Sequence, residues 1–297
     1  MKLFQIVSNG KKLDVLLTET LNQMRYLLRA RPEDIVPEAS IFLREKKIVR
    51  HHIAVKKGAV VSILVPEKFL IKPCFELTTD HIAYEDSDII IIDKPSGLPT
   101  QSTQKPGEDH LYSATIAFLT KKNPAKLAYV GLHHRLDRDT SGLVLMTKKS
   151  SANKSISDQF RDKKMIKKYR AIVEGEVPKQ KRWKVEAPLR RLFESKLFRF
   201  GIDHKKGDAA TTLFEYQHVL VNNHHLIECQ PITGRTHQIR IHLASSQLPI
   251  IGDRLYGVTS EVRMQLHAYR LQFDHPMTGK AMDIVSQRQL ELEQLPI

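Results

Sequence analysis

The densest group of polar and charged residues lies between two apolar stretches, from His133 to Gly142. Its sequence is His-His-Arg-Leu-Asp-Arg-Asp-Thr-Ser-Gly, which places Asp137 between Arg135 and Arg138. Nearby positive charge favours the ionised form of a carboxyl group. An ionised, positioned carboxylate can act as a base, a metal ligand or a nucleophile. A structural ion pair in a turn fits the same residues equally well, so this segment alone does not choose between the two.

A second polar cluster runs from Thr233 to His242. We predict that Thr233 caps a helix over residues 235–245, whose first turn would present free backbone N–H groups. From this position Arg235 would reach a carboxylate or a phosphate. An ordinary charged helix start explains the same pattern. His237 and His242 are five residues apart, whereas two histidines that share a metal on one helix face are four apart.

The composition predicts a soluble protein with an anionic partner. The net charge is +14, and nucleic acid is the commonest partner of so basic a chain. Residues 1–72 contain 14 Lys+Arg and 7 Asp+Glu, and 14 − 7 = +7, which is half of the excess charge. This asymmetry favours a separate basic module at the N-terminus. A charged surface that only confers solubility is the alternative.

The same sequence argues against several classes of protein. No apolar stretch of about 18 residues predicts a transmembrane helix, and the first residues do not read as a signal peptide. Cys74 and Cys229 are too few for a disulfide framework or a cysteine-based zinc site. We therefore predict buried thiols, a cytoplasmic location and, since no phosphate-binding or dinucleotide-binding glycine motif occurs, no cofactor.

Three segments must position the polar clusters. We predict a small basic α/β module over residues 1–72, a linker over 73–82 and a larger domain over 83–297. In the module, residues 17–30 have helical spacing with Thr18 or Thr20 as the cap, and residues 39–45 suggest a second short helix. Short strands follow around residues 48–55 and 60–65.

The larger domain alternates strands and helices irregularly, which predicts an α+β fold with a mixed, mostly antiparallel sheet. Residues 89–92 and 143–146 are apolar throughout and predict strands buried on both faces. The remaining elements are expected as strands over 169–173, 212–217 and 225–230, helices over 111–120, 151–165 and 235–245, and a polar loop over 99–110.

The motif His134-Arg135-Leu136-Asp137-x-x-Thr140-Ser141-Gly142 resembles the signature of the RluA-type pseudouridine synthases. The other motifs of that family also occur in order over about residues 80–285, one before this signature and the others after it. They are Asp93-Lys94-Pro95-x-Gly97, Tyr169-x-Ala171-x-Val173-x-Gly175, Thr233-Gly234-Arg235-x-His237-Gln238-Ile239-Arg240-x-His242, Ile251-Gly252-Asp253-x-x-Tyr256-Gly257, Leu266-His267-Ala268 and His275-Pro276. Residues 1–72 resemble, more loosely, the small RNA-binding module named after ribosomal protein S-four, without its usual Asn-Gly turn.

The resemblance implies an isomerase that converts uridine to pseudouridine in ribosomal RNA or tRNA, without a metal or cofactor. A monomer is the default expectation. Asp137 would be the nucleophile and Arg235 its ion-pair partner. Tyr169 would stack on the uracil and provide a hydroxyl for proton removal, and Arg135 would enter the space that the base leaves. Further RNA contacts are expected from His134, Thr140, Lys94 and Arg240. A catalytically silent RNA-binding or ribosome-assembly protein and a metal-dependent hydrolase are the alternatives.

Overall fold

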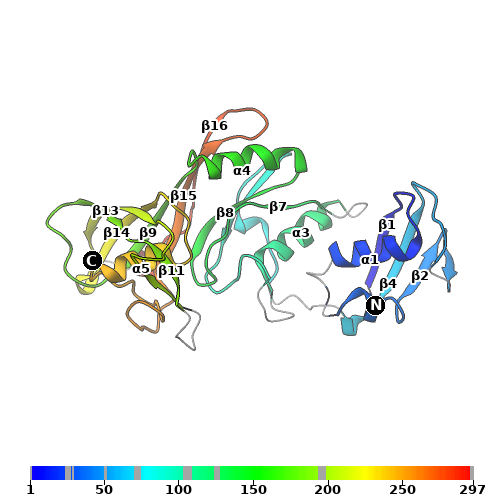
Figure 1. The fold of residues 1–297 in the computed structure, drawn as a ribbon, viewed down its shortest axis with the longest axis horizontal. Helices are drawn as coiled ribbons and strands as arrows, with labels where there is room; N and C mark the ends of the chain where they lie inside the picture. The colour runs from blue at the N-terminus through cyan, green and yellow to red at the C-terminus, as the bar shows by residue number, and fades with distance from the viewer. Residues whose placement is uncertain are drawn as a thin grey trace. The chain divides into compact units, whose positions relative to one another are not determined.

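The computed structural model describes residues 2–23, 28, 30–49, 52–69, 75–102, 109–123, 128–192 and 199–294 (Figure 1). The chain forms two compact units. One contains Met1–Leu77 and Gln101–Ala128, and the other contains Thr78–Thr100 and Tyr129–Ile297. Cys74 and most of the expected polar loop, residues 103–108, lie outside the described residues. Within the described part of the chain, no helix is both long and apolar enough to cross a membrane.

The first unit contains a four-stranded antiparallel sheet in the order β1-β4-β2-β3. Its core is formed by Leu13, Leu17 and Leu21, which are spaced by four residues on one face of α1, and by side chains of β4. The bounds are β1 Lys2–Val7, α1 Leu13–Gln23, α2 Pro32–Ile35, β2 Ser40–Leu43, β3 Lys46–Ile48, β4 Val60–Val65, the 3-10 helix η2 Glu67–Phe69 and α3 Leu111–Lys122.

Two predictions for this unit are wrong. Residues 39–45 do not form a helix, because Ser40–Leu43 is a strand that a two-residue turn joins to β3. Arg44 and Glu45 both have positive φ, a conformation that hairpin turns require but that Asn and Gly usually supply, so the sequence carried no turn signal. The first helix begins at Leu13, and Thr18 and Thr20 lie inside it rather than at its cap. The rest of the predicted helix, residues 24–27 and 29, lies outside the described residues.

The second unit contains a ten-stranded sheet in the order β10-β13-β14-β9-β15-β8-β6-β5, with β16 and β7 paired to β15 and β8. All of its pairs are antiparallel except β15 with β8, which confirms the predicted α+β fold with a mostly antiparallel sheet. The strands are β5 Ile82–Glu85, β6 Ile89–Lys94, β7 Gly131–Leu132, β8 Ser141–Thr147, β9 Ile166–Val173, β10 Arg182–Glu186, β13 Thr211–Val219, β14 His225–Pro231, β15 Leu266–Asp274 and β16 Ala281–Val285.

Strands β6 and β8 are buried along their whole length, as their apolar sequences predict. Ile156 of α4 packs with side chains of β6, β8 and β15 in one core cluster. Helix α5 contacts β12, β13 and β14. The other elements of this unit are α4 Asn153–Arg161, α5 Gln238–Ser245, the hairpin of β11 Leu189–Leu192 and β12 Arg199–Ile202, and the 3-10 helices η3 Thr79–His81, η4 Ser150–Ala152, η5 Val221–Asn223 and η6 Glu291–Gln294.

Candidate active site

Asp137 lies in the loop between β7 and β8 and lines a pocket of about 300 Å³. Tyr169 of β9, Arg240 of α5 and Arg235 in the turn before α5 line the same pocket. The loop leads into the parallel contact of β8 with β15, where Gly142 has a φ of +115°. A Cβ atom at Gly142 would lie 2.3 Å from the carbonyl oxygen of Ala268, so only glycine allows β15 to approach this closely.

The turn after β6 holds the Asp137 loop in place. The Thr100 hydroxyl donates to the carbonyl oxygen of Leu136 at 2.8 Å and accepts from the Leu136 N–H at 3.1 Å. The Ser96 hydroxyl donates to the carbonyl oxygen of Asp139 at 2.6 Å, and the Gly97 N–H donates to that of Arg138 at 2.9 Å. The loop backbone on both sides of Asp137 is therefore fixed by Ser96 and Gly97 in the turn after β6 and by Thr100.

Lys94 is the centre of this arrangement, and the prediction that it contacts RNA is wrong. Its side chain is fully buried, at 0% exposure, and cannot reach a phosphate. The Nζ atom donates to the carbonyl oxygens of Pro95, Leu98 and Arg138 at 3.0, 2.8 and 2.9 Å. Burial lowers the pKa of Lys94 to about 7, against the opposing charges of Asp139 and Asp137. Lys94 thus ties the turn after β6 to the loop of Asp137.

Replacing Lys94 by methionine is expected to lower the free energy of unfolding by about 3 kcal/mol, because three buried or partly buried carbonyl oxygens lose their common donor. Turnover is expected to fall as well, since the Asp137 loop loses one of its anchors. Urea denaturation and initial rates measure the two effects.

Lys149→Met provides the control, because the Lys149 side chain is half-exposed and makes one ion pair, with the largely buried Asp88. Its replacement should lower the free energy of unfolding by less than that of Lys94. The dependence of stability on pH provides a second readout. Between pH 7 and the ordinary pKa of 10.5, the unfolded chain binds a proton at Lys94 that the folded chain releases. The stability of the wild-type protein should therefore rise relative to Lys94→Met across this interval. A pH-independent difference would contradict the burial of a titrating amine.

Arg240, not Arg235, is the ion-pair partner of Asp137. The Nη1 atom of Arg240 donates to Oδ2 of Asp137 at 3.1 Å. The Nε atom of Arg235 donates to the carbonyl oxygen of Ala209, and its Nη1 lies 3.8 Å from Asp208. The pairing predicted for Arg235 is wrong because Arg235 precedes α5 in an exposed turn, whereas Arg240 lies inside α5. Arg240 is 6% exposed and lines the pocket, and the RNA contact predicted for it stays a prediction.

Asp253 fixes the orientation of Arg240. Its two carboxylate oxygens accept from Nε and Nη2 of Arg240, both at 2.7 Å. Burial alone would lower the pKa of Arg240 and raise that of Asp253. Their mutual hydrogen bonds and charges outweigh burial and shift both pKa values in the opposite direction, so both groups stay ionised. With the guanidinium held in this way, Nη1 of Arg240 donates to Asp137.

One carboxylate oxygen of Asp137 has no hydrogen-bond partner in the described part of the chain. Arg240 donates to Oδ2, and Nε2 of His237 lies 3.8 Å from that same atom. Among the described residues, Oδ1 has no hydrogen-bond donor. The Asp137 side chain is 26% exposed and faces the pocket, so Oδ1 is accessible to a ligand there. The arrangement therefore presents a carboxylate that is held at one oxygen and available at the other.

The start of α5 differs from the predicted cap. The helix begins at Gln238, and the residue before it, His237, has the left-handed conformation with φ 58°. Thr233 does not cap the helix, because its hydroxyl donates to Oε1 of Gln238 at 2.7 Å. The same Oε1 accepts from the backbone N–H of Arg235 at 3.0 Å. The side chain of Gln238 thus replaces the expected threonine cap and folds the turn back on the helix.

Tyr169 is 8% exposed and lines the pocket beside Asp137. Burial, and then the charge of Asp137, raise the pKa of its phenol above the ordinary value, so the ring is neutral. Within the described residues, the hydroxyl makes no hydrogen bond to protein. The ring is thus positioned beside the carboxylate and has a polar group free for a ligand.

His134 and Thr140 have roles in supporting the loop. Nε2 of His134 accepts from the backbone N–H of Leu145 at 2.9 Å, and burial lowers the pKa of this ring to about 3. A neutral, bonded imidazole does not attract phosphate. Thr140 is buried, and its N–H donates to the carbonyl oxygen of Asp137 at 3.2 Å. Both residues line the pocket, and direct RNA contacts by their side chains stay a prediction. Arg135 is exposed at the pocket, so its predicted role remains a prediction.

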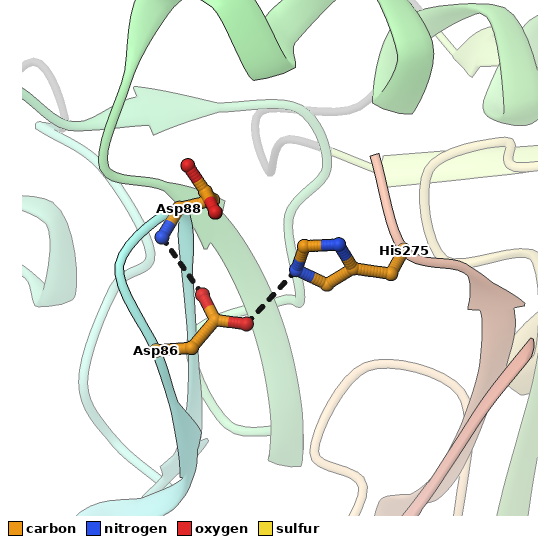
Figure 2. A group of neighbouring side chains, drawn as sticks. All are labelled: Asp86, Asp88 and His275. Atoms are coloured by element: carbon orange, nitrogen blue, oxygen red, sulfur yellow. Dashed lines mark hydrogen bonds and ion pairs between the residues drawn. The ribbon is translucent and has the colours of Figure 1, made fainter. Parts of the chain in front are cut away.

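One cluster of the second unit has the residue types of a metal site (Figure 2). Asp86 lies between the backbone nitrogen of Asp88 and the ring of His275, with hydrogen bonds of 2.8 and 2.9 Å. Both oxygens of Asp88 are bonded, to Lys149 and Ser87. Nδ1 of His275 accepts two backbone N–H groups. Each of these side-chain oxygens and nitrogens has a protein partner. The bond between Asp86 and His275 connects the β5–β6 turn to the β15–β16 turn.

The sequence prediction missed three residues of the site. Asp253 orients Arg240, and Tyr256 hydrogen-bonds Nδ1 of His237 at 2.8 Å and lies under the Arg240 guanidinium at 5.0 Å. Both belong to a motif that was recognised without a role. Lys167 lines the pocket two residues before Tyr169, so alternation along β9 places both side chains on the same face. That spacing was the available signal for Lys167.

Comparisons with known proteins agree with this geometry. Residues 88–245 match the family model described as RNA pseudouridylate synthase. A Mycoplasma genitalium protein described as an uncharacterised RNA pseudouridine synthase is 32% identical, over 95% of this chain and 91% of its own length. The ribosomal large subunit pseudouridine synthase C of Escherichia coli is 33% identical, over 87% of this chain and 76% of its own.

A similar solved structure is human RNA pseudouridylate synthase domain containing 1. Its TM-score is 0.58 at 22% identity, and the match covers 72% of this chain and 86% of that one. At this identity the likeness concerns the fold, and it agrees with the α+β architecture of the second unit.

Proposed function

This chain belongs to the RluA-type RNA pseudouridine synthases, and we propose that it isomerises uridines of large-subunit ribosomal RNA with Asp137 as the nucleophile. The observation that supports this role is the asymmetric environment of Asp137, with Oδ2 bonded to Arg240 and Oδ1 open to the pocket. The substrate class follows from the name of the Escherichia coli relative, and tRNA is the alternative outcome of the experiment below.

The reaction breaks the bond from N1 of uracil to the ribose, rotates the ring and forms a bond from C5 to the same ribose carbon. The proton on C5 is lost and N1 gains one, so nothing is oxidised and nothing is added. Oδ1 of Asp137 is the group that would attack the base or the sugar, while the ion pair with Arg240 stabilises the carboxylate. These steps need only residues of the chain.

Tyr169 would hold the detached uracil by stacking on its face. Because its phenol is neutral, removal of the C5 proton by this hydroxyl requires a second group to accept the phenolic proton. Asp137, whose charge contributes to the raised pKa of Tyr169, is the candidate acceptor. The target nucleotide must leave its stack to reach this pocket, and Arg135, which is exposed at the pocket, would occupy the vacated space.

The experiment is to incubate the full-length protein with unmodified transcripts of large-subunit ribosomal RNA and of tRNAs and to map pseudouridine. We expect conversion of discrete uridines in the ribosomal RNA, unchanged by excess EDTA. Conversion only in tRNA would reject the proposed substrate. Absence of conversion in both, with binding unaffected by Asp137→Ala, would favour a silent RNA-binding protein. Loss of activity on chelation, restored by a divalent ion, would contradict a reaction by protein groups alone. A cytoplasmic monomer is part of this proposal.

A further inference from the structure

A second pocket of about 290 Å³ adjoins the pocket of Asp137. We call it the basic groove, because its described lining contains Arg161, Lys163, Lys167 and Arg235 and no aspartate or glutamate. The two pockets share Phe160, Lys167, Pro231, Thr233, Gly234 and Arg235. The groove is therefore a continuation of the candidate active site, from the turn before α5 to the segment between α4 and β9.

Lys167 forms the wall common to both pockets, and its environment differs from that of an ordinary surface lysine. Within the described residues no carboxylate lies within ion-pair distance of its Nζ atom, which lies 5.6 Å from the centre of the Phe160 ring. Burial lowers the pKa of its amine. Removing an ammonium group from water without a partner is unfavourable. A partly desolvated cation at the junction of two pockets is the arrangement expected where an anionic ligand completes the site.

The other cations of the groove differ in how far protein carboxylates neutralise them. Arg161 is compensated by Asp158 and Asp162, at 2.6 and 2.9 Å. Lys163 is exposed and, among the described residues, has no ion-pair partner. Arg235 has only a 3.8 Å contact with the exposed Asp208. Three side chains from three positions, Lys163, Lys167 and Arg235, therefore converge on the groove with uncompensated or weakly compensated charge.

We propose that the basic groove binds a backbone phosphate of the RNA next to the target uridine, with Lys163, Lys167 and Arg235 as its ligands. This inference rests on the proposed function, because a uridine beside Asp137 carries a phosphodiester on each side within a nucleotide's length. One phosphate and part of its ribose fit a volume of about 290 Å³. Fixing that phosphate would hold the displaced nucleotide in the pocket while Arg135 occupies the stack.

The chain offers a matched control for the test. Lys164 and Lys168 are the sequence neighbours of Lys163 and Lys167, carry the same charge and do not line either pocket. Lys168 instead pairs with Glu228 at 2.6 Å. The groove variant Lys163→Gln/Lys167→Gln and the control variant Lys164→Gln/Lys168→Gln therefore remove equal charge from the same segment. A difference in RNA binding between the two variants therefore reflects the positions of the replaced lysines and not the net charge.

The measurement is the affinity of each full-length variant for fragments of unmodified large-subunit ribosomal RNA that the wild-type protein retains, at several KCl concentrations. One lost phosphate contact should reduce the slope of log affinity against log salt by about 0.7 and weaken binding about tenfold at low salt. The control should change both by much less. Equal changes in the two variants would overturn the proposal.

Two further measurements separate this role from a structural one. Lys167→Arg preserves the charge and should keep the slope within about 0.2 of the wild-type value, whereas a purely steric role for Lys167 predicts the opposite. Inorganic phosphate at constant ionic strength should weaken RNA binding by the wild type more than by the groove variant. An equal effect on both would place the phosphate site elsewhere. All of these readouts are binding measurements, so they test the phosphate site in the groove even if the wild type forms no pseudouridine. Absence of pseudouridine would reject the proposed function alone.

Discussion

Asparagine at position 137 is expected to reduce pseudouridine formation by at least about a thousandfold, because an amide oxygen is a poor nucleophile and removing a nucleophile costs this much or more. The substitution keeps the shape of the side chain, so the amide oxygen can take the place of Oδ2 and still accept from Arg240. RNA affinity should stay within about tenfold, since it rests on phosphate contacts elsewhere. Single-turnover conversion of saturating transcript and a parallel binding titration measure the two quantities.

Asp139→Asn is the control for Asp137→Asn. Asp139 lies two residues away in the same loop, but its carboxylate pairs with the exposed Arg138. Its replacement should change the rate less than about threefold. Comparable losses in the two variants would indicate a general effect of loop charge instead of a nucleophile. Full activity of Asp137→Asn would reject the role of Asp137 outright.

The sequence predicted the location of the site better than its internal contacts. Asp137 and Tyr169 could be placed because each belongs to a motif and the motifs occur in order. The partner of Asp137 could not, because two arginines five residues apart in one motif are equally plausible from sequence. Only the start of α5 at Gln238 decides between them, and that start depends on the left-handed His237 and on a glutamine that replaces the expected cap.

The fold shows the same division between local pattern and tertiary contact. The apolar runs at β6 and β8 predicted buried strands correctly, since burial on both faces requires apolar residues at every position. Residues 39–45 could not be assigned because the strand pairs with β4, which is distant in sequence, and turns at Arg44 and Glu45. Lys94 was expected to contact RNA. Its burial could not be predicted, because a lysine is rarely fully buried and nothing in the sequence indicates three converging carbonyl groups.

Replacing Arg240 by methionine is expected to abolish turnover, whereas Arg235→Met should leave the rate at saturating RNA within about tenfold. Arg240 is the residue that bonds Asp137 in the structure, and without it the carboxylate loses its orientation and its compensating charge. Arg235 lies at the pocket edge, where its loss should weaken binding more than the rate at saturation. Measuring both the rate at saturating RNA and the RNA affinity of each variant therefore distinguishes the roles of the two arginines.

Arg240→Met also leaves Asp253, which is 1% exposed, without its two strongest donors. An uncompensated buried carboxylate costs about 3–5 kcal/mol, so this variant should unfold at a much lower urea concentration. Loss of activity could then reflect loss of fold. The double variant Arg240→Met/Asp253→Asn removes the buried charge. The amide oxygen at position 253 can still accept from the N–H groups of Leu255 and Tyr256, which the native carboxylate binds at 2.9 and 3.2 Å.

The double variant should therefore recover much of the lost stability while remaining inactive. This outcome would separate the two roles of Arg240, because stability depends on neutralising Asp253 and turnover depends on orienting Asp137. Recovery of turnover together with stability would show that the contact between Arg240 and Asp137 is dispensable. Loss of turnover at saturating RNA in Arg235→Met, with Arg240→Met active, would restore the assignment made from the motif alone, against the geometry of α5. These variants test whether one guanidinium serves both the buried carboxylate of Asp253 and the reactive carboxylate of Asp137.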